Sequence, residues 1–338
     1  MRIMRTMLLK FFFLIPSWFF NIFIKKRPPY RGHIFDQQSQ ALISLQPSID
    51  LSTIPDKEIS DIRKLITENR IKNKLSLGTK NPVIKLDHFV GNDKNILLRE
   101  YNPDSINTDK VVLFFHGGGY VLNSVQTHDD TVSYMAEKLQ ARFFSLEYRL
   151  SPENKYPDSL DDALFAYEWL EKNGYTSDNI SVCGDSAGAH LAASLVHKLI
   201  ADNGDRLPDS QFLIYPMCDP ECKSESYDDL AEGYLLTTKT MIWFWEKFGK
   251  SEENIKDQVF NLLKLDTDLA MPNTIIITAG FDPLCDDGEK YAYLLHEKGD
   301  KVKQLHYPNM FHGFASATRI KAAQTAVDDF LREYKEIL

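Results

Sequence analysis

The sequence predicts an α/β fold in which helices cover both faces of a mainly parallel central sheet. Three observations predict it. After about residue 80, short apolar runs alternate with longer segments of helical period. Residues 111–115 (VVLFF) form a continuous apolar run, as in a strand buried on both faces. The 338 residues contain no internal repeat and no low-complexity tract.

The expected elements follow one another in the order that such a sheet requires. Strands are expected at residues 82–90, 96–101, 111–115, 143–148, 180–183, 212–215, 274–278 and 302–307. Helices are expected at residues 132–139, 160–170, 187–200 and 322–334, with polar amphipathic helices between 32 and 80. Because strands and helices of these lengths alternate, most strands are expected to be parallel.

One segment departs from this alternation. About sixty residues separate the strand at 212–215 from the strand at 274–278, where one crossover helix would be enough. The segment contains MIWFWEKF at 241–248, which has helical spacing and is rich in aromatic residues. We therefore expect residues 217–268, together with residues 32–80, to form a helical cap.

Ser186 is the candidate nucleophile. It lies in the stretch Gly184-Asp185-Ser186-Ala187-Gly188, between an expected strand and an expected helix. This is the setting of the G-x-S-x-G nucleophile elbow, whose turn is so tight that the flanking positions must lack bulk. The hydroxyl would project above the sheet at the amino end of a helix, whose dipole favours developing negative charge. The competing interpretation is an incidental glycine-rich turn.

A glycine-rich loop, His116-Gly117-Gly118-Gly119-Tyr120, directly follows the strand at 111–115. Ester hydrolysis passes through a tetrahedral oxyanion on which backbone N–H groups must converge, and glycine lets the backbone approach without a Cβ atom. The three glycines are therefore candidates for an oxyanion hole. A phosphate-binding loop is the alternative, but the loop lacks the GK[ST] ending of a P-loop and the third glycine of a dinucleotide fingerprint.

His312 is the candidate general base, and Asp282 is the candidate carboxylate that orients it. Five histidines follow Ser186, and His312 stands in a loop directly after an expected strand, at the edge where parallel sheets bind ligands. Asp282 also follows a strand end, whereas Asp286 and Asp287 open a helix, where acidic residues serve the helix dipole. The chain order Ser, Asp, His is that of α/β-hydrolases and of neither chymotrypsin nor subtilisin.

As a set, these motifs resemble those of the hormone-sensitive-lipase-like (family IV) esterases of the α/β-hydrolase superfamily. The matching stretches are HGGGY at 116–120, YRLSPE at 148–153, YPDSLDDA at 156–163, GDSAG at 184–188, AGFDPLCDDG at 279–288 and FHGF at 311–314. The resemblance implies the α/β-hydrolase fold, and it implies that the N–H groups of Gly118, Gly119 and Ala187 hold the oxyanion. The family usually has arginine where Cys285 stands and alanine where Ser151 stands.

The residues together predict a carboxylic ester hydrolase. His312 would take the proton of Ser186 as Oγ attacks the ester carbonyl, and water would later release the acyl group. The resemblance implies small-molecule esters with short to medium acyl chains. One alternative is an acyltransferase that uses the same triad. Another is a non-catalytic binding module on the same fold, although such modules typically lose a triad residue.

Composition excludes several classes of partner. The formal net charge is −9 and the basic residues are scattered, whereas nucleic-acid binding needs a clustered basic face. The four cysteines are too few and too irregularly spaced for a disulfide framework. Cys218 and Cys222 have no histidine nearby and do not predict a zinc site. No metal, cofactor or nucleic acid is therefore expected, and a homodimer is left open.

The first 31 residues are more hydrophobic than the rest of the chain. Residues 11–24 read FFFLIPSWFFNIFI between basic residues on both sides, and no small residues suggest a signal-peptide cleavage site. A helix over them would measure about 21 Å, short of a hydrocarbon core of about 30 Å. We therefore expect residues 7–27 to contact a membrane surface and residues 32–338 to form the catalytic domain.

The basic residues are slightly more numerous after this segment than before it, which favours a catalytic domain on the cytoplasmic side. Two alternatives remain for the segment. It could form a hydrophobic helix packed on the protein itself, and the protein could be soluble in the cytoplasm.

Overall fold

The strands form one central sheet. The computed structural model describes residues 12, 13, 15, 17–20, 22, 24, 26–45 and 50–338. In this part of the chain the sheet has eight strands in the order β1-β2-β4-β3-β5-β6-β7-β8. The strands are β1 (Val83–Val90), β2 (Ile96–Pro103), β3 (Val111–Phe115), β4 (Arg142–Leu146), β5 (Ile180–Asp185), β6 (Ser210–Ile214), β7 (Asn273–Phe281) and β8 (Val302–Phe311).

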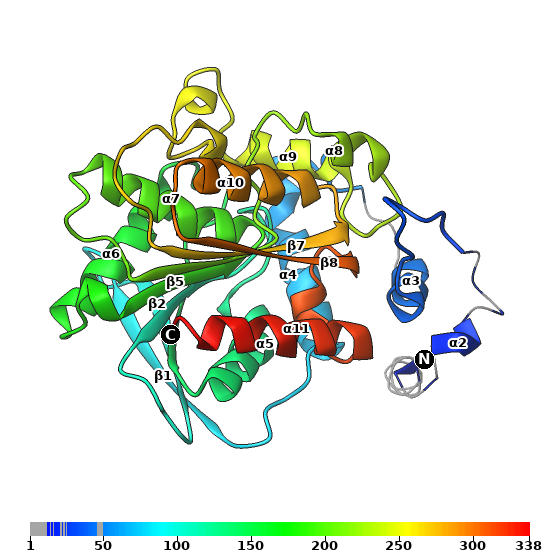
Figure 1. Ribbon diagram of the computed structural model, residues 1–338, viewed down its shortest axis with the longest axis horizontal. Helices are drawn as coiled ribbons and strands as arrows, with labels where there is room; N and C mark the ends of the chain where they lie inside the picture. The colour runs from blue at the N-terminus through cyan, green and yellow to red at the C-terminus, as the bar shows by residue number, and fades with distance from the viewer. Residues whose placement is uncertain are drawn as a thin grey trace.

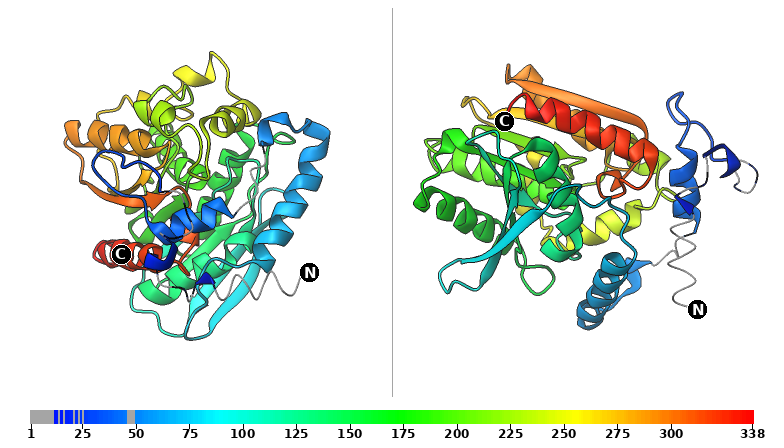
Figure 2. Two further views of the ribbon diagram at one scale, coloured as in Figure 1. Left: turned by 90° about the vertical axis from the view of Figure 1, so that its right-hand side faces the viewer. Right: turned by 90° about the horizontal axis from the view of Figure 1, so that it is seen from below.

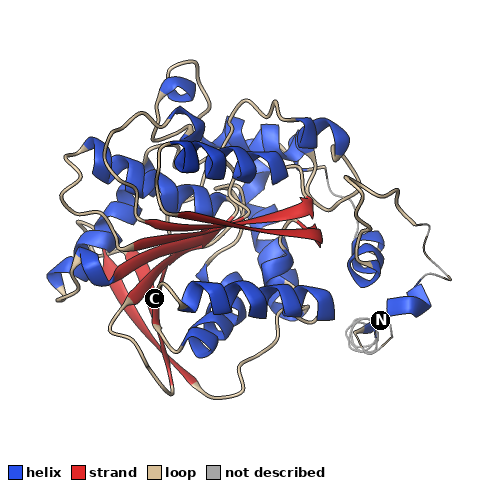
Figure 3. Cartoon of the chain, in the orientation of Figure 1, coloured by secondary structure: helices blue, strands red, loops and turns tan. Residues whose placement is uncertain are grey.

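The sheet is mostly parallel. β2 pairs antiparallel with both β1 and β4, and every later pairing, from β4–β3 to β7–β8, is parallel. Figure 3 shows the strands as red arrows, and β7 and β8 end on the same side of the molecule. The carboxyl ends of the parallel strands therefore share one edge of the sheet, where ligands of such sheets bind.

Helices cover both faces of the sheet (Figure 1). One face carries α6 (Asp158–Lys172), α7 (Ala187–Ala201) and α10 (Cys285–Glu297), and the other carries α5 (Val125–Leu139) and α11 (Lys321–Lys335). The predicted fold, with a mainly parallel sheet and helices on both faces, is confirmed. The connections from strand to helix to parallel strand follow from the alternation of the two periods in the sequence.

β3 shows why a continuous apolar run predicts a central strand. Val111, Leu113 and Phe115 point into the core beneath α6 and α7. Val112 and Phe114 point into the other core, beneath α5 and α11. All five side chains are buried, so neither face of the strand has a position for a polar residue.

Two predicted boundaries are wrong for identifiable reasons. α5 begins at Val125 rather than at residue 132, because Ser124 caps the helix by accepting the N–H of Thr127 at 3.2 Å. The first turns of α5 are polar in sequence, so apolar spacing does not reveal them. β8 continues to Phe311 rather than ending at residue 307, and it passes through Pro308, a residue type that normally argues against a strand interior.

The two segments expected to form a cap meet at the carboxyl edge of the sheet. α4 (Asp56–Lys72), α8 (Glu225–Asp229) and α9 (Thr238–Phe248) lie beside this edge in Figure 1. Two ion pairs join the segments: Lys239–Asp50 at 2.6 Å and Lys247–Asp56 at 2.5 Å. Arg63 of α4 donates hydrogen bonds to the carbonyls of Val121 and Ser151, at 2.7 and 2.9 Å, and so fixes the helix beside the glycine loop.

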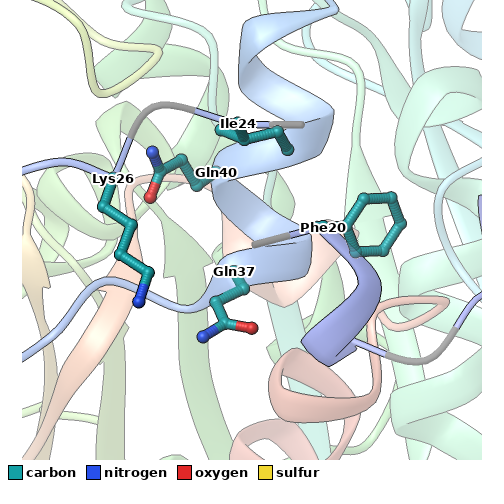
Figure 4. A pocket seen from close by; sticks show the side chains of 5 residues that line it. All are labelled: Phe20, Ile24, Lys26, Gln37 and Gln40. Carbon is teal, nitrogen blue, oxygen red and sulfur yellow. The ribbon is translucent and has the colours of Figure 1, made fainter. Parts of the chain in front are cut away.

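The N-terminal helices lie at one end of the molecule, as the two views of Figure 2 show. α2 (Ser17–Phe20) is next to α3 (Gln37–Ser44), and Phe12 and Phe20 are buried in the core that contains Phe35. A small pocket beside α2 and α3 is lined by Phe20, Ile24, Lys26, Gln37 and Gln40 (Figure 4).

The predicted membrane contact of residues 7–27 lies in part outside the described residues, which omit 1–11, 14, 16, 21, 23 and 25. Within the part of the chain that the structure describes, no helix is both long enough and apolar enough to cross a bilayer.

Candidate active site

Ser186, His312 and Asp282 come together at the carboxyl edge of the sheet. They directly follow the last residues of β5, β8 and β7 respectively. The Nε2 atom of His312 lies 2.9 Å from Oγ of Ser186, and Nδ1 lies 2.8 Å from Oδ2 of Asp282. A nucleophile, a base and an orienting carboxylate in this order are the requirements for nucleophilic catalysis by serine.

The backbone at Ser186 has the strained turn that exposes a nucleophile. Its φ and ψ angles are 57° and −119°, in a region that residues other than glycine rarely adopt. A Cβ atom on Gly184 would lie 2.3 Å from the backbone of Gly188, and one on Gly188 would lie 2.0 Å from the carbonyl oxygen of Phe115. Close backbone approach, rather than chain flexibility, therefore requires both glycines of the G-x-S-x-G motif.

Asp282 is held in place by the turn that begins α10. It is fully buried, and its Oδ1 atom accepts the N–H of Leu284 at 2.9 Å. This bond leaves Oδ2 directed at His312. A carboxylate in this position favours a proton on Nδ1 of the imidazole, which leaves Nε2 with a lone pair toward Ser186.

The glycine loop is anchored by Asp185, the neighbour of the nucleophile. The N–H of Gly117 donates to Oδ1 of Asp185 at 2.8 Å, and Nε2 of His128 lies 3.3 Å from the same oxygen. Gly117 was predicted to contribute to an oxyanion hole, and this prediction is wrong for its N–H, because the side chain of Asp185 already occupies that donor. The anchoring contacts of Asp185 and His128 were not predicted, although Asp185 lies inside the GDSAG motif.

The other two glycines of the loop keep their N–H groups available. Among the described residues, no protein acceptor takes the N–H of Gly118 or Gly119. Both have positive φ angles, of 128° and 61°. A Cβ atom on Gly119 would lie 2.1 Å from the ring of Phe244, so α9 packs directly on this loop. Ala187, the third predicted donor, is the first residue of α7, where a helix N–H has no intrahelical acceptor.

Two buried histidines of α7 are structural rather than catalytic. His190 lies 2.9 Å from the carbonyl oxygen of Phe260, and His197 lies 2.7 Å from that of Gln258. Burial lowers the pKa of His190 to about 3 and that of His197 to about 4, so both rings are neutral. Their contacts connect α7 to the segment before β7.

Asp287 has a role that the sequence interpretation missed. It was expected to serve only the dipole of α10, but its side chain is fully buried and crosses to the expected cap. Its Oδ2 atom accepts the N–H groups of Cys218 and Asp219, both at 3.1 Å, and the hydroxyl of Tyr227 at 2.9 Å. Asp286 contacts the same region, since it accepts the N–H of Ser226 at 3.0 Å. These carboxylates fasten the segment that follows β6 to the core.

We expect Asp287→Ala to destabilise the protein by about 3 kcal/mol, because it leaves several buried donors without an acceptor. The free energy of unfolding in urea measures this change. Glu225→Ala is the matched control, since Glu225 is an exposed acid of the same region. Equal stability of the two variants would contradict the structural role of Asp287.

Comparison with known proteins agrees with this geometry. Residues 112–316 match a family model described as the alpha/beta hydrolase fold. The carboxylesterase NlhH of Mycobacterium tuberculosis is 32% identical over 255 residues, which cover 72% of this chain and 79% of that protein. The ethyl acetate hydrolase of Pseudomonas putida is 32% identical over 224 residues, covering 64% of this chain and 70% of that protein.

A solved structure of an ester hydrolase from the metagenome of Lake Arreo superimposes with a TM-score of 0.78 at 30% identity, covering 89% of this chain and 96% of that one. The fold, the strand ends that carry the site and the relatives point to one conclusion. This chain belongs to the hormone-sensitive-lipase-like family of the α/β-hydrolase superfamily and is a carboxylesterase.

Proposed function

We propose that the carboxylesterase cleaves small-molecule esters with Ser186 as nucleophile, His312 as general base and Asp282 as the orienting carboxylate. The observation that carries this proposal is the continuous chain of contacts from Asp282 through His312 to Ser186, with separations of 2.8 and 2.9 Å. As Oγ forms a bond to the ester carbonyl carbon, its proton passes to Nε2 of His312. The same proton then goes to the departing alcohol, which leaves an acyl-enzyme.

In this mechanism the carbonyl oxygen becomes an oxyanion, and the N–H groups of Gly118, Gly119 and Ala187 stabilise it. Two observations support these three donors. The N–H groups of Gly118 and Gly119 are not taken by a described acceptor, and Ala187 stands at the amino end of α7 beside Ser186. Water then attacks the acyl-enzyme, with His312 again as the base, and the acid product leaves.

Short to medium acyl chains are the proposed substrates. The support is the position of α9, whose Phe244 ring packs against Gly119 at the proposed oxyanion hole. Its neighbour Trp245 is fully buried against His190 and Phe260. Because its ring lies at Gly119, Phe244 is the aromatic residue that we propose limits the space for an acyl chain.

We expect Phe244→Ala to shift the preferred substrate toward longer acyl chains. The kcat/KM ratio of a long ester to a short one should rise about tenfold, the scale on which apolar pockets discriminate methylene groups. A series of p-nitrophenyl esters from acetate to palmitate measures the shift. Ile242→Ala, on the exposed side of α9, is the control and should leave the ratio unchanged. A wild-type rate that keeps rising to palmitate would contradict the proposed chain length.

Residues 7–27 are proposed to contact the surface of an anionic membrane, with residues 32–338 as the catalytic domain and residues 32–80 and 217–268 as its cap. Large apolar side chains are exposed in and after the segment, with Ile22 at 64% and Ile34 at 67%. They lie close in sequence to Lys26 and Arg31, both of which are exposed. This combination of apolar and basic side chains is typical of an interfacial anchor.

Full-length protein should sediment with vesicles that contain anionic lipid, whereas protein that begins at Arg31 should stay in solution and keep its esterase activity. Neutral vesicles are the control, since basic residues add affinity for anionic headgroups only. If both proteins partition alike, the segment packs on the protein itself, as Phe12 and Phe20 already do in part.

A further inference from the structure

Cys285, Glu289 and His306 bring three kinds of metal ligand together outside the triad. Cys285 and Glu289 lie one turn apart on α10, and His306 lies on the neighbouring strand β8. The Sγ atom of Cys285 is 3.5 Å from Oε1 of Glu289, and the same oxygen is 3.7 Å from Nδ1 of His306. All three ligand atoms lie within 4.8 Å of one another.

These separations are close to those of a tetrahedral zinc site. Zinc bonds measure about 2.3 Å to sulfur and about 2.0–2.2 Å to nitrogen or oxygen, which places two tetrahedral ligand atoms about 3.3–3.6 Å apart. The sulfur–oxygen separation of 3.5 Å falls in this range, and the oxygen–nitrogen separation of 3.7 Å is just above it. The third separation, between the sulfur of Cys285 and the imidazole of His306, is at most 4.8 Å. Side-chain rotations that shorten it would let a single ion contact all three side chains.

Neighbouring hydrogen bonds present His306 in the form that binds metals. The side-chain amide of Gln304 donates to Oγ1 of Thr278 at 3.1 Å, and this hydroxyl lies 2.9 Å from Nδ1 of His306. The hydroxyl proton can then point at Nδ1, so Nδ1 carries a lone pair rather than a proton. An ion at this site would take that lone pair in place of the Thr278 hydroxyl.

Arg31 is a cation beside the cluster, but its contacts leave one oxygen of Glu289 open. Arg31 contacts the other oxygen of Glu289, Oε2, at 3.8 Å and pairs with Asp286 at 2.8 Å, which leaves Oε1 facing the thiol and the imidazole. The Sγ atom of Cys285 donates its proton to Oε1 of Glu289 at 3.5 Å. A bound divalent ion would displace that proton to solvent and hold the thiolate.

We propose that Cys285, Glu289 and His306 bind one divalent transition-metal ion of the Zn²⁺ type, with water as the fourth ligand. The site would fasten α10, which follows Asp282, to β8, which leads to His312. The link to the acid of the triad is short, since the N–H of Cys285 donates to the carbonyl of Asp282 at 2.9 Å. The ion would act on stability and on the alignment of these two elements, and it would take no part in the ester chemistry.

Calorimetric titration of untagged full-length protein with Zn²⁺ tests the site, with Co²⁺ as the spectroscopic probe. We expect one saturable site, a rise in Tm with Zn²⁺, and a thiolate-to-cobalt charge-transfer band in the near ultraviolet. Cys285→Ser should abolish the band and weaken Zn²⁺ binding at least about 100-fold. Loss of a metal ligand lowers the affinity more than loss of a side chain that only orients a ligand.

His306→Gln is the second variant, and it should fold because the His306 side chain is 35% exposed. It should weaken Zn²⁺ binding to a similar extent while keeping a charge-transfer band, since the thiolate remains. Cys222→Ser is the matched control, because it removes a thiol outside the cluster. It should change neither the Zn²⁺ affinity nor the charge-transfer band. Absence of saturable binding, survival of the band in Cys285→Ser, or its loss in Cys222→Ser would each overturn the proposal.

Discussion

Replacement of Ser186 by alanine is expected to lower kcat on the order of 10⁶-fold while the protein stays folded. In the proposed mechanism the hydroxyl supplies the atom that attacks the ester, and the alanine side chain has no group that could replace it. The strained turn at Ser186 is stabilised by contacts of the flanking glycines, which this substitution does not touch. Hydrolysis of p-nitrophenyl butyrate and circular dichroism together measure activity and folding.

Ser194→Ala is the matched control, since Ser194 is an equally buried serine about two turns further along α7. Its hydroxyl contacts His190 at 3.3 Å and takes no part in the proposed chemistry. The control should keep nearly full activity. A Ser186→Ala preparation, free of contaminating esterase, that retained activity well above background would refute the assignment of the nucleophile.

Replacement of Asp282 by asparagine should lower kcat by about 10⁴-fold, by analogy with serine proteases. The asparagine amide can present its N–H₂ group to Nδ1 of His312, which would reverse the tautomer and place a proton on Nε2. Nε2 could then no longer accept the proton of Ser186. Initial rates at saturating ester measure the effect, and an unchanged Tm would show that the loss is chemical.

Asp286→Asn tests whether this loss is specific to Asp282. Asp286 lies one residue beyond the start of α10, where it accepts from the backbone of Ser226 and pairs with Arg31. Its replacement should lower activity only mildly. If Asp286→Asn lowered activity more than Asp282→Asn, the carboxylate that orients His312 would not be the one that directly follows the strand end at Phe281.

The sequence predicted the sheet and the grouping of the candidate site residues because both depend on local patterns. The strand at 111–115 has the bounds predicted for it, since a run of five apolar residues can be buried only between two helix layers. Ser186, Asp282 and His312 each follow a strand, and strand ends of a parallel sheet meet at one edge. Their proximity therefore follows from topology, without knowledge of any side-chain contact.

Features that depend on side-chain contacts between distant segments could not be predicted in this way. Whether the N–H of Gly117 is free depends on the direction of the Asp185 side chain. The burial of Asp287 depends on the path of the segment after β6, which has no periodicity to reveal it. Likewise, the Cys285–Glu289 pair lies on one face of a helix, but its histidine comes from a strand whose alignment with that helix the sequence does not specify.

Covalent labelling tests the central claim most directly. A p-nitrophenyl phosphonate ester should form a bond between phosphorus and Oγ of Ser186 and release p-nitrophenolate, while the serine proton passes to His312. Mass spectrometry of the digested protein should then show one adduct, on the peptide that contains Ser186. We expect no adduct in Ser186→Ala and a much slower reaction in Asp282→Asn. An adduct on another residue, or equal labelling of Ser186→Ala and wild-type protein, would contradict the proposed mechanism.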